Sequence, residues 1–365
     1  MRALFYHGSP DWSGSARAFA AAAEGLVHRG WDVAFACVAD SPVSEQVARR
    51  TFEVVPMREG ATWLDPVRRL KDLMIERFIE VVFVHGDQEH FLVSVALRLA
   101  ERAAILRRIP SDESDTGRLL GQLAARNVAT GYLFDSEEEL AAAGSLPSKR
   151  ISTLVAPLGV DVDGYDTVRA TPRPSLGAAT TDRLVVCVYD RLGHARSATV
   201  FRTFAMLAPR HPELRLAIVG PGSDEEDLRM HAAALGLTKT VTYLGIRDDQ
   251  IAVLRSADLG WVVASGDEAA FAMLDFMALR VPVIAERGEQ AQRYLSDGIA
   301  GILLPAGDIP ASAATLAAFL AHDEQRVAMG NAGRTRVARD FTATAMIDGF
   351  ESAATVARER SAWHS

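Results

Sequence analysis

Cysteine is nearly absent from this sequence, which has only two in 365 residues. Cys37 and Cys187 each lie in a strand-like apolar run, in different halves of the chain and without the spacing of metal ligands. A disulfide framework and a cysteine-based metal site are therefore excluded. We expect two buried free thiols in a protein of a reducing compartment.

Long apolar runs are missing as well. No uncharged apolar stretch reaches the roughly 18 residues of a membrane span, and MRALFYHGSP at the N-terminus contains too short an apolar run for a signal peptide. A cytoplasmic location is the resulting expectation. A helix expected at Val67–Phe78 carries Arg68, Arg69 and Lys71 beside apolar residues. Peripheral contact with the inner face of an anionic membrane is one interpretation, and a solvated helix packed on its sheet is the simpler one.

A basic excess is also lacking, because 39 lysines and arginines face 47 aspartates and glutamates, for a net charge of -8. This balance argues against a nucleic-acid partner. The acid excess is mild and implies no cationic partner.

What the chain does contain is a repeated alternation of short apolar strands and helices, which is typical of parallel sheets covered on both faces. We expect strands at Arg2–Tyr6, Trp31–Val38, Arg50–Pro56, Glu80–His85, Ala104–Arg107, Thr130–Asp135, Leu184–Val188, Leu214–Val219, Val241–Leu244, Leu259–Ala264, Pro282–Ala285 and Gly301–Leu304. Expected helices include Asp115–Arg126 and Glu268–Leu279. The predicted organisation is an N-terminal α/β domain over 1–162, a Pro/Thr/Gly/Ala-rich linker over 163–182, a C-terminal α/β domain over 183–340, and a final helix over 341–365 that can cross back to the first domain.

The stretch from Asp267 to Ala285 combines acidic residues with a helical pattern. Asp267 follows Gly266, and Asp275 lies eight positions further on, so on one helix the two carboxylates are about 80° apart around the axis. A helix N-terminus with unsatisfied backbone N–H groups beside two carboxylates suits the diphosphate and sugar of a nucleotide-sugar. An N-capping Asp267 on an amphipathic helix with a solvated Asp275 explains the same residues without a ligand.

Two loops fit a bound phosphate. The segment Ser13-Gly14-Ser15 joins the first strand to a helix, where backbone amides can approach an anion, although such turns also use small residues for steric reasons alone. Arg191 and Arg196 follow the strand at 184–188, and their guanidiniums can pair with a diphosphate. A solvated loop is the alternative for these arginines.

Segments along nearly the whole chain resemble, in the same order, those of the retaining GT-B glycosyltransferases of the large nucleotide-sugar-dependent family (group 1, or family 4, type). SGSARAFAAAAEGLVHRGWDVAF is similar to that family's opening segment, FDSEEELAAAGSL to its V-S-E helix, and VAPLGVDVDGY to its hinge. YDRLGHAR is similar to G-R-L-x-x-x-K, with Arg191 at the arginine and Arg196 at the lysine. Asp267–Ala285 takes the place of E-G-F-G-x-x-x-x-E-A-M-A-x-G-x-P-V-V-A. The resemblance implies the GT-B fold, in which two Rossmann-like parallel-sheet domains face each other across a cleft.

The resemblance also implies residue roles. Asp267 replaces the glutamate that touches the transferred sugar, and Asp275 replaces the one that grips the nucleotide ribose, each with one methylene less. Asp267, Arg191 and Arg196 are the expected catalytic residues, because the arginines would stabilise the leaving diphosphate. The expected donor-binding residues are Gly14, Ser15, Gly245, Ile246, Arg247, Glu268, Ala269, Ala270 and Asp275.

Besides these two aspartates and an altered G-G-x-x-E region, which reads EQAQR at Glu289–Arg293, the sequence departs from the family pattern in two further motifs. The family's G-F-G is Glu268-Ala269-Ala270 here, where β-carbons restrict the approach of a diphosphate to the backbone and a carboxylate repels it. The family's first-domain histidine falls on Arg107-Arg108, while His85 ends the preceding strand. His85, Arg107 and Arg108 are therefore the candidates for acceptor contact.

The function expected from the resemblance is transfer of a sugar from a nucleoside diphosphate, with retention, to a glycan, lipid or small alcohol. No cofactor and no metal are expected, and the pair of aspartates in Asp161-Val162-Asp163 is interpreted as part of the hinge. The altered donor motif supports an alternative, a GT-B homologue that has lost transfer activity and acts as a binding or scaffold protein. Other GT-B activities, such as nucleotide-sugar epimerisation, are a weaker third hypothesis.

Overall fold

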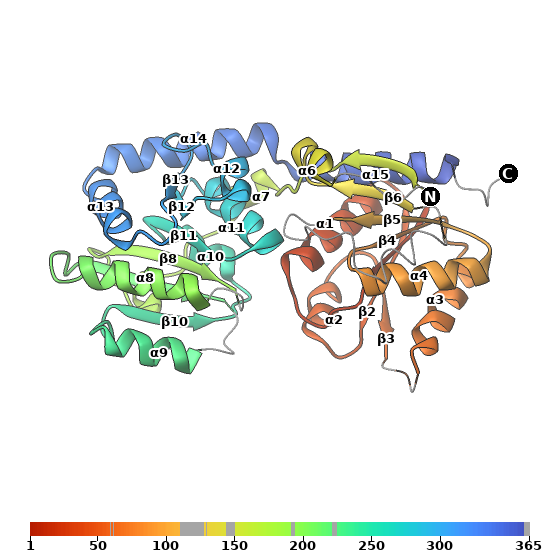
Figure 1. Cartoon of the computed structure of the whole chain (residues 1–365), viewed down its shortest axis with the longest axis horizontal. Helices are drawn as coiled ribbons and strands as arrows, with labels where there is room; N and C mark the ends of the chain where they lie inside the picture. The colour runs from red at the N-terminus through yellow and green to blue at the C-terminus, as the bar shows by residue number, and fades with distance from the viewer. Residues whose placement is uncertain are drawn as a thin grey trace. The chain divides into compact units, whose positions relative to one another are not determined.

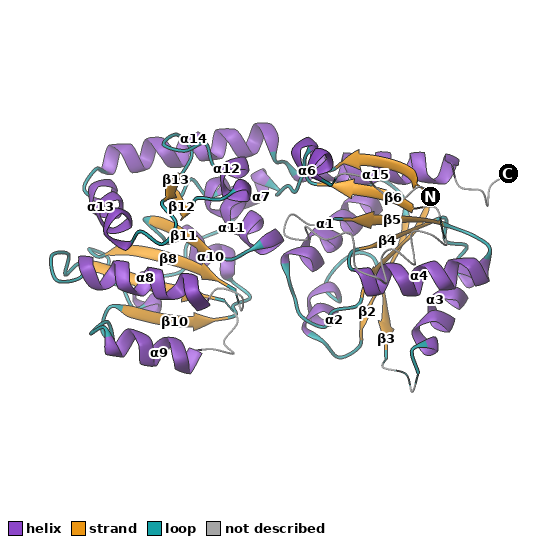
Figure 2. Cartoon of the chain, viewed as in Figure 1, coloured by secondary structure: helices purple, strands orange, loops and turns teal. Residues whose placement is uncertain are grey.

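The computed structural model describes residues 1–58, 60, 62–109, 128, 130–143, 150–190, 194–220 and 225–360, without the side chains of 150, 151 and 194–197. The chain forms two compact units. Unit 1 comprises Met1–Leu158 and Ala343–Ser365, and unit 2 comprises Gly159–Thr342. Strands alternate with helices in both units, as the colours of Figure 2 show, and Figure 1 follows the chain through them.

Unit 1 is built on a sheet with the strand order β3-β2-β1-β4-β5-β6-β7, in which every pair is parallel. Its elements are β1 (Arg2–His7), α1 (Gly14–His28), β2 (Asp32–Val38), α2 (Pro42–Val47), β3 (Glu53–Met57), α3 (Leu64–Glu76), β4 (Val81–Val84), α4 (Asp87–Ala100), β5 (Ala104–Arg108), β6 (Thr130–Phe134), α6 (Glu137–Ala142), β7 (Arg150–Val155) and α15 (Ala343–Arg360).

Alternate residues of these strands serve two cores. Leu4 and Tyr6 of β1 face the core that includes the buried side of α3 and α4. Phe5, between them, faces the opposite side, where its ring lies 5.4 Å from that of Phe19 on α1 and 6.2 Å from that of Phe350 on α15. The period of two along a strand thus explains why the apolar runs are nearly unbroken: both faces of the sheet are covered.

Unit 2 is built on a second parallel sheet, with the order β10-β9-β8-β11-β12-β13. Its elements are α7 (Val162–Thr167), the 3-10 helix η1 (Arg173–Leu176), β8 (Arg183–Tyr189), α8 (His194–Leu207), β9 (Leu214–Val219), α9 (Glu225–Ala234), β10 (Val241–Gly245), α10 (Gln250–Arg255), β11 (Leu259–Val263), α11 (Gly266–Ala278), β12 (Val283–Glu286), α12 (Glu289–Tyr294), β13 (Ile302–Leu304), α13 (Ile309–Leu320) and α14 (Asp323–Asp340).

The two faces of this sheet are also both covered. Cys187 of β8, Trp261 of β11 and Phe204 of α8 share one core with α9 and α13. On the other face Gly260 of β11 packs so closely on Phe276 of α11 that an added β-carbon would lie 2.5 Å from the ring. Glycine is needed there because α11 approaches the strand without room for a side chain.

The predicted α/β architecture with two parallel sheets is confirmed, and each expected strand is present within a few residues of its expected bounds. Among the described residues, five short elements were not predicted: α2, β7, α7, η1 and α12. The sequence around α2 contains a usable signal, since Ser41 and Ser44 form a capping box and Pro42 occupies the first turn. The expected helix over 115–126 lies outside the described residues.

Residues 163–182, which we expected to be a linker, are instead folded into unit 2. The segment contains most of α7 and all of η1, and Tyr165 and Leu176 bury their side chains there. Guanidiniums fix α7: Arg255 donates to the Tyr165 carbonyl at 2.8 Å, and Arg334 donates to the Val162 carbonyl at 2.6 Å. The composition of this segment suggested a linker. The contacts that hold it in place could not be predicted from it, because they come from residues far away in the sequence.

Candidate functional site

The strands of unit 2 end at an edge of the sheet that glycines keep open. β8 ends at Tyr189, β9 at Val219 and β10 at Gly245, and the backbone N–H of Gly220 donates to the Gly245 carbonyl at 3.1 Å. Gly220 has φ 154° and Gly245 has φ 63°, conformations that side-chain-bearing residues rarely adopt. A β-carbon on Gly220 would lie 2.1 Å from the Tyr189 carbonyl oxygen. We call the edge where β8–β13 end the carboxyl edge.

A pocket opens at this edge on the side of the sheet that α8 and α9 cover. We call it the edge pocket; it is open to solvent and has enclosed room for about one water molecule. Its lining consists of two tyrosines, two glycines, two aliphatic residues and one acid: Tyr189, Tyr243, Gly220, Gly245, Ile218, Leu228 and Glu225. The arrangement follows from the register, because Ile218 pairs with both Cys187 and Tyr243, so these side chains share one face.

The N-terminus of α11 lies next to the end of β8 at the same edge. Asp190, the residue after Tyr189, accepts hydrogen bonds from the backbone N–H and the hydroxyl of Ser265 at 2.6 and 2.7 Å. Ser265 is the N-cap residue of α11, and its side chain does not cap the helix because it donates to Asp190. Gln290 of α12 donates to the Gly266 carbonyl at 2.7 Å and fixes the first turn from the other side.

The acidic motif lies along α11 as the sequence predicted, although its members differ in exposure. Asp267 and Glu268 are in the first turn, where Asp267 is buried and Glu268 half-buried. Ala269 and Ala270 are both buried. Asp275 is 0% exposed and accepts a hydrogen bond of 2.5 Å from the hydroxyl of Tyr165 on α7. A ribose therefore has no open path to Asp275 in this conformation, and Tyr165 is a residue of the site that sequence reasoning missed.

Gly245, Ile246 and Arg247 follow β10 beside the edge pocket. Ile246 is 74% exposed, whereas isoleucine is among the residues most often buried. Arg247 is paired with Asp249 at 2.6 Å, and this contact raises the pKa of the guanidinium and lowers that of the carboxyl. Arg191 lies outside the described residues; Arg196 falls within α8, but its side chain is not described.

In unit 1, a polar cluster gathers where β1 and β4 end. The ring of His7 lies 6.3 Å from that of His85, nearly parallel to it, and its Nε2 is 3.3 Å from the Ser15 hydroxyl. The Nδ1 of His7 faces the Ser9 carbonyl at 3.2 Å, which can only accept, so in the neutral ring Nδ1 carries the proton and Nε2 accepts from Ser15. Gly14 begins α1 beside Ser15, so the structure brings Gly14, Ser15 and His85 together.

His7 is the member of this cluster that sequence reasoning missed. A signal existed, because ALFYH and VVFVH both end a buried strand with histidine. Glu89, buried on α4, ties the two strand ends together: it accepts from the backbone N–H groups of Gly8, His85 and Gly86. The carboxylate is therefore oriented by the backbone rather than by solvent.

The side chains of Arg107 and Arg108 are buried, and each is paired with a buried aspartate. Their side chains are 2% and 1% exposed; Arg107 is 2.5 Å from Asp87, and Arg108 donates to both oxygens of Asp135 at 2.7 and 2.9 Å. Burial and the nearby Arg107 lower the pKa of His90 to about 3. Neighbouring residues of a strand point to opposite faces, so the two arginines form their ion pairs on opposite sides of β5. Neither arginine is exposed to an acceptor in this conformation.

Two further expectations concern metals and membranes. Asp161 accepts from the Gly164 N–H at 3.2 Å and caps α7, in agreement with its interpretation as structural. Among the described residues, no group of three or more histidines, cysteines, aspartates and glutamates is arranged to hold a metal ion. Across the same residues, no helix combines the length and apolarity needed to cross a membrane.

Comparison with known proteins finds a family match over part of unit 2. The family described as glycosyl transferases, group 1, matches residues 168–336. The phosphatidyl-myo-inositol mannosyltransferase of Mycobacterium leprae is 36% identical over 39% of this chain and 39% of its own length. The D-inositol 3-phosphate glycosyltransferase of Corynebacterium jeikeium is 29% identical over 51% of this chain and 47% of its own. The matched part thus spans less than half the length of these relatives.

Solved structures extend the likeness to both units. HepE of Anabaena, in complex with UDP and glucose, covers 97% of this chain and 99% of its own with a TM-score of 0.80 at 16% identity. Sucrose-phosphate synthase of Thermosynechococcus elongatus covers 96% and 97% with a TM-score of 0.76 at 17% identity. At such identities the likeness establishes the fold. The chain is a GT-B-fold relative of the group 1 glycosyl transferases, and residues 168–336 are the part that matches the family itself.

Proposed function

We propose that this protein transfers a sugar from a nucleoside diphosphate to a hydroxyl group of an acceptor, with retention at the anomeric carbon and without a metal. The observation that carries the proposal is the arrangement at the carboxyl edge of unit 2. There the edge pocket adjoins, through Tyr189 and Asp190, the N-terminus of a helix whose N-cap side chain is turned away. Open parallel sheets bind nucleotides at this edge.

The chemistry follows from where charge develops. When the bond between the sugar and the diphosphate breaks, negative charge accumulates on the leaving diphosphate. A helix N-terminus stabilises that charge, and Arg191 and Arg196 would add charge-assisted hydrogen bonds. Asp267, in the first turn of α11, would be the group that contacts the sugar. Retention requires the acceptor hydroxyl to attack on the face from which the diphosphate leaves.

The names of relatives suggest the kind of acceptor. The relatives of this chain in sequence include transferases named for phosphatidyl-myo-inositol and for D-inositol 3-phosphate. Another is named a GDP-mannose-dependent mannosyltransferase that acts on a phosphatidylinositol monomannoside. We propose an acceptor of the same broad class, a polyol, glycan or lipid-linked sugar, handled by a protein of the cytoplasm without a cofactor.

One observation favours the alternative of binding without transfer. Asp275 occupies the place of the ribose-gripping glutamate, yet it is fully buried against Tyr165. Loss of that ribose contact would weaken donor binding and leave the first turn of α11 as the main anchor. The two functions are separated by turnover, because a binding protein would retain nucleotide affinity without hydrolysing or transferring the sugar.

A thermal-shift screen with UDP, GDP and ADP, followed by a hydrolysis assay with the matching nucleotide-sugar, tests the proposal. We expect one nucleoside diphosphate to raise the melting temperature and its sugar to be released slowly. Asp267→Asn is expected to retain nucleotide binding and to lower sugar release at least about tenfold, as for removal of a group that acts in the transition state. Asp227→Asn, an exposed acid of α9 outside the edge pocket, is the control.

The outcomes separate the alternatives. Binding without sugar release in the unsubstituted protein, even with polyol acceptors present, would favour the binding function. No stabilisation by any nucleoside diphosphate would contradict both.

Peripheral contact with a membrane is a second part of the proposal. α3 and its flanks expose Trp63, Ile75 and Phe78, with Arg68 and Arg69 exposed beside them. Apolar and basic side chains on one helix suit an anionic lipid surface. Sedimentation with vesicles of phosphatidylglycerol should carry the protein down at low salt, and Trp63→Ser should reduce the bound fraction. Equal sedimentation with neutral phosphatidylcholine vesicles would contradict the electrostatic part.

A further inference from the structure

The strand order of unit 1 identifies the place where its sheet can bind a ligand. β1 pairs with β2 on one side and with β4 on the other, so the chain changes direction across the sheet between β1 and β4. Open parallel sheets bind ligands outside the carboxyl ends of the strands at such a point. We call it the switch point of unit 1, and its polar residues are His7, Ser13, Ser15, His85 and Glu89.

We propose that the switch point of unit 1 binds an uncharged polyol or sugar and rejects a phosphorylated one. The inference rests on the proposed function, because it names the class of acceptor that the transferase takes. It also differs from the names of two relatives, phosphatidyl-myo-inositol mannosyltransferase and D-inositol 3-phosphate glycosyltransferase, which both name a compound that carries a phosphate.

A chain of hydrogen bonds with a fixed direction runs through the switch point. Because Nδ1 of His7 donates to the Ser9 carbonyl, Nε2 of the neutral ring accepts the proton of the Ser15 hydroxyl at 3.3 Å. The Ser15 oxygen lies 2.9 Å from that of Ser13 and therefore accepts the Ser13 proton. With its proton used, Ser13 can only accept, and it takes one hydrogen bond from the Ala16 N–H at 3.4 Å. Its second lone pair suits a ligand that donates.

A phosphate group is a poor partner for the Ser13 oxygen. A phosphate monoester carries a charge of about -1.5 to -2 near pH 7 and presents oxygens that accept hydrogen bonds. A hydroxyl of a polyol, by contrast, both donates and accepts. Ser13 is half-buried, and His85, also half-buried, adds a second imidazole nearly parallel to that of His7. The direction of the hydrogen bonds therefore favours a ligand with hydroxyl groups over one with a phosphate.

Backbone N–H groups that could bind a phosphate at the switch point are already used by Glu89. Its Oε1 accepts from the Gly8 N–H, and its Oε2 accepts from the N–H groups of His85 and Gly86 at 3.1 and 2.6 Å. Gly8 follows β1, while His85 and Gly86 follow β4, so this carboxylate bridges the loops on both sides of the switch point. Phosphate sites are commonly built from such N–H groups in loops and at helix N-termini. Here the protein supplies its own anion.

Glu89 also places a negative charge at the switch point. The residue is 8% exposed, so water and salt screen its charge weakly. Its effect on a neighbour is visible at Tyr6, whose pKa is raised to about 12 by burial and by the charge of Glu89. The buried guanidinium of Arg107 is paired with Asp87. A phosphate brought close to Glu89 would therefore be repelled, whereas an uncharged ring would not.

The corresponding place in unit 2 is built differently. The strand order there changes direction between β8 and β11, and Ser265 after β11 does not cap α11 with its side chain. In unit 1, Ser13 caps α1, and Glu89 accepts from the Gly86 N–H at the start of α4. Helix N-termini are thus satisfied by protein oxygens at the switch point of unit 1. This difference fits a division in which unit 2 takes the diphosphate and unit 1 takes an uncharged acceptor.

Glu89 has a simpler explanation, which the test must separate from ligand selection. A carboxylate that ties two loops together stabilises the unit whatever the ligand is. Loss of loop order would weaken all acceptors alike, whereas loss of charge changes the ratio between phosphorylated and uncharged ones. Glu76 is an exposed acid at the end of α3, which lies where β4 begins, at the opposite edge of the sheet. Glu76→Gln therefore removes the same charge from the same unit, away from the switch point.

Competition between matched acceptors tests the inference on the full chain. The probes are myo-inositol with myo-inositol 1-phosphate, and methyl mannoside with mannose 6-phosphate, measured by saturation-transfer NMR and as acceptors of the sugar. We expect the uncharged member of a pair to be preferred at least about tenfold, and Glu89→Gln to lower that preference at least about fivefold. Glu76→Gln should leave it within about twofold. Ser13→Ala should raise the KM for the uncharged acceptor several-fold and leave the KM for the donor unchanged.

Each outcome decides the question. Preference for the phosphorylated compounds, or binding of none of the uncharged ones, would overturn the inference, while release of the sugar to water would still support a transferase. Equal changes in Glu89→Gln and Glu76→Gln would show that net charge is responsible and would also overturn it. Absence of both nucleotide binding and sugar release would overturn the proposed function together with this inference. If circular dichroism shows that Glu89→Gln does not fold, the preference of the unsubstituted protein and the KM values of Ser13→Ala decide.

Discussion

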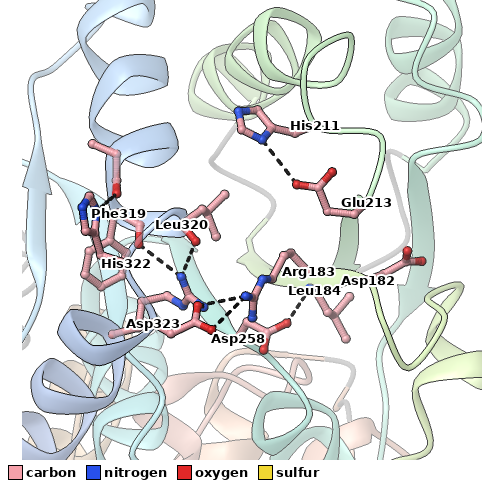
Figure 3. Close-up of polar contacts among 12 residues, drawn as sticks. Asp182, Arg183, Leu184, His211, Glu213, Asp258, Phe319, Leu320, His322 and Asp323 are labelled. Atoms are coloured by element: carbon pink, nitrogen blue, oxygen red, sulfur yellow. Dashed lines mark hydrogen bonds and ion pairs between the residues drawn. The ribbon is translucent and has the colours of Figure 1, made fainter.

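Both edges of the sheet in unit 2 carry charged side chains, but these side chains are arranged differently at the two edges. We call the edge where the strands begin the amino edge. There, charged side chains form ion pairs and hydrogen bonds with one another and with the backbone (Figure 3). Asp258 accepts from the Leu184 N–H at 2.8 Å and from Arg173 at 3.0 Å. Asp323 binds Arg183 and also Arg326, which donates in addition to carbonyls at the end of α13.

At the carboxyl edge, glycines lie where the amino edge has paired charged side chains. Gly220 and Gly245 leave room for the edge pocket, Glu225 accepts a hydrogen bond from Arg229 there, and Asp190 beside it accepts one from Ser265. The difference indicates that charged side chains paired with one another leave no room for a ligand at the amino edge. Charged side chains beside glycines leave such room at the carboxyl edge. Helix N-termini converge on this second edge in any parallel sheet with right-handed crossovers, which is why the opening lies there.

The largest expected effect comes from closing the carboxyl edge. Gly220→Ala places a β-carbon 2.1 Å from the Tyr189 carbonyl, at φ 154°. We expect a loss of about 1–3 kcal/mol in the free energy of unfolding from backbone strain, and at least a tenfold loss of nucleotide affinity. Urea unfolding and calorimetric titration measure the two. Gly236→Ala is the matched control, because Gly236 also has positive φ, 75°, but an added β-carbon meets nothing within 4 Å. Equal nucleotide affinity in the two variants would contradict the comparison.

The amino edge should respond in stability and not in binding. Arg326 is 5% exposed, and Arg326→Met would leave the Phe319 and Leu320 carbonyls and Asp323 without its hydrogen bonds. We expect the free energy of unfolding to fall by about 1–3 kcal/mol, the cost of leaving buried polar groups unpaired. Nucleotide affinity, measured by titration, should stay the same within twofold. A large change in affinity would mean that the two edges are energetically coupled.

The smallest effect is expected from the exposed ion pair of Arg183 and Asp323, through its dependence on pH. The hydrogen bond from Arg183, and then that from Arg326, lowers the pKa of Asp323 below its ordinary value of 3.8. A carboxyl with a lowered pKa in the folded state stabilises the fold above pH 3.8, and this stabilisation is lost as the pH falls through the folded-state pKa. The urea midpoint of Arg183→Gln should therefore lie slightly below that of the unsubstituted protein at pH 7. The difference should shrink below pH 3.8, and a difference that grew with acid would contradict the assignment.

The sequence was sufficient to predict what depends on local pattern. The alternation of strands and helices, and the placement of Asp267 and Asp275 on one helix, follow from apolar periodicity and are confirmed. The contact between Tyr165 and Asp275 joins residues 110 positions apart, and no local pattern contains it. The burial of Arg107 and Arg108 likewise depends on Asp87 and Asp135, which belong to other parts of the unit. Pattern alone left these arginines as candidates for acceptor contact, and the assignment of any site residue to donor or acceptor stays a prediction.

Unit 1 consists of two segments of the chain separated by unit 2, and this affects how the protein folds during translation. α15 supplies Phe350, whose ring lies 5.4 Å from that of Phe83, and an added β-carbon on Gly349 would lie 2.6 Å from that of Ala156. The chain enters unit 2 and leaves it side by side, since Val160 and Thr342 form a parallel bridge. During translation unit 2 can therefore fold as a closed loop while one face of the first sheet, on which α1 already packs, still lacks α15. That interval is when the nascent chain most needs protection from aggregation.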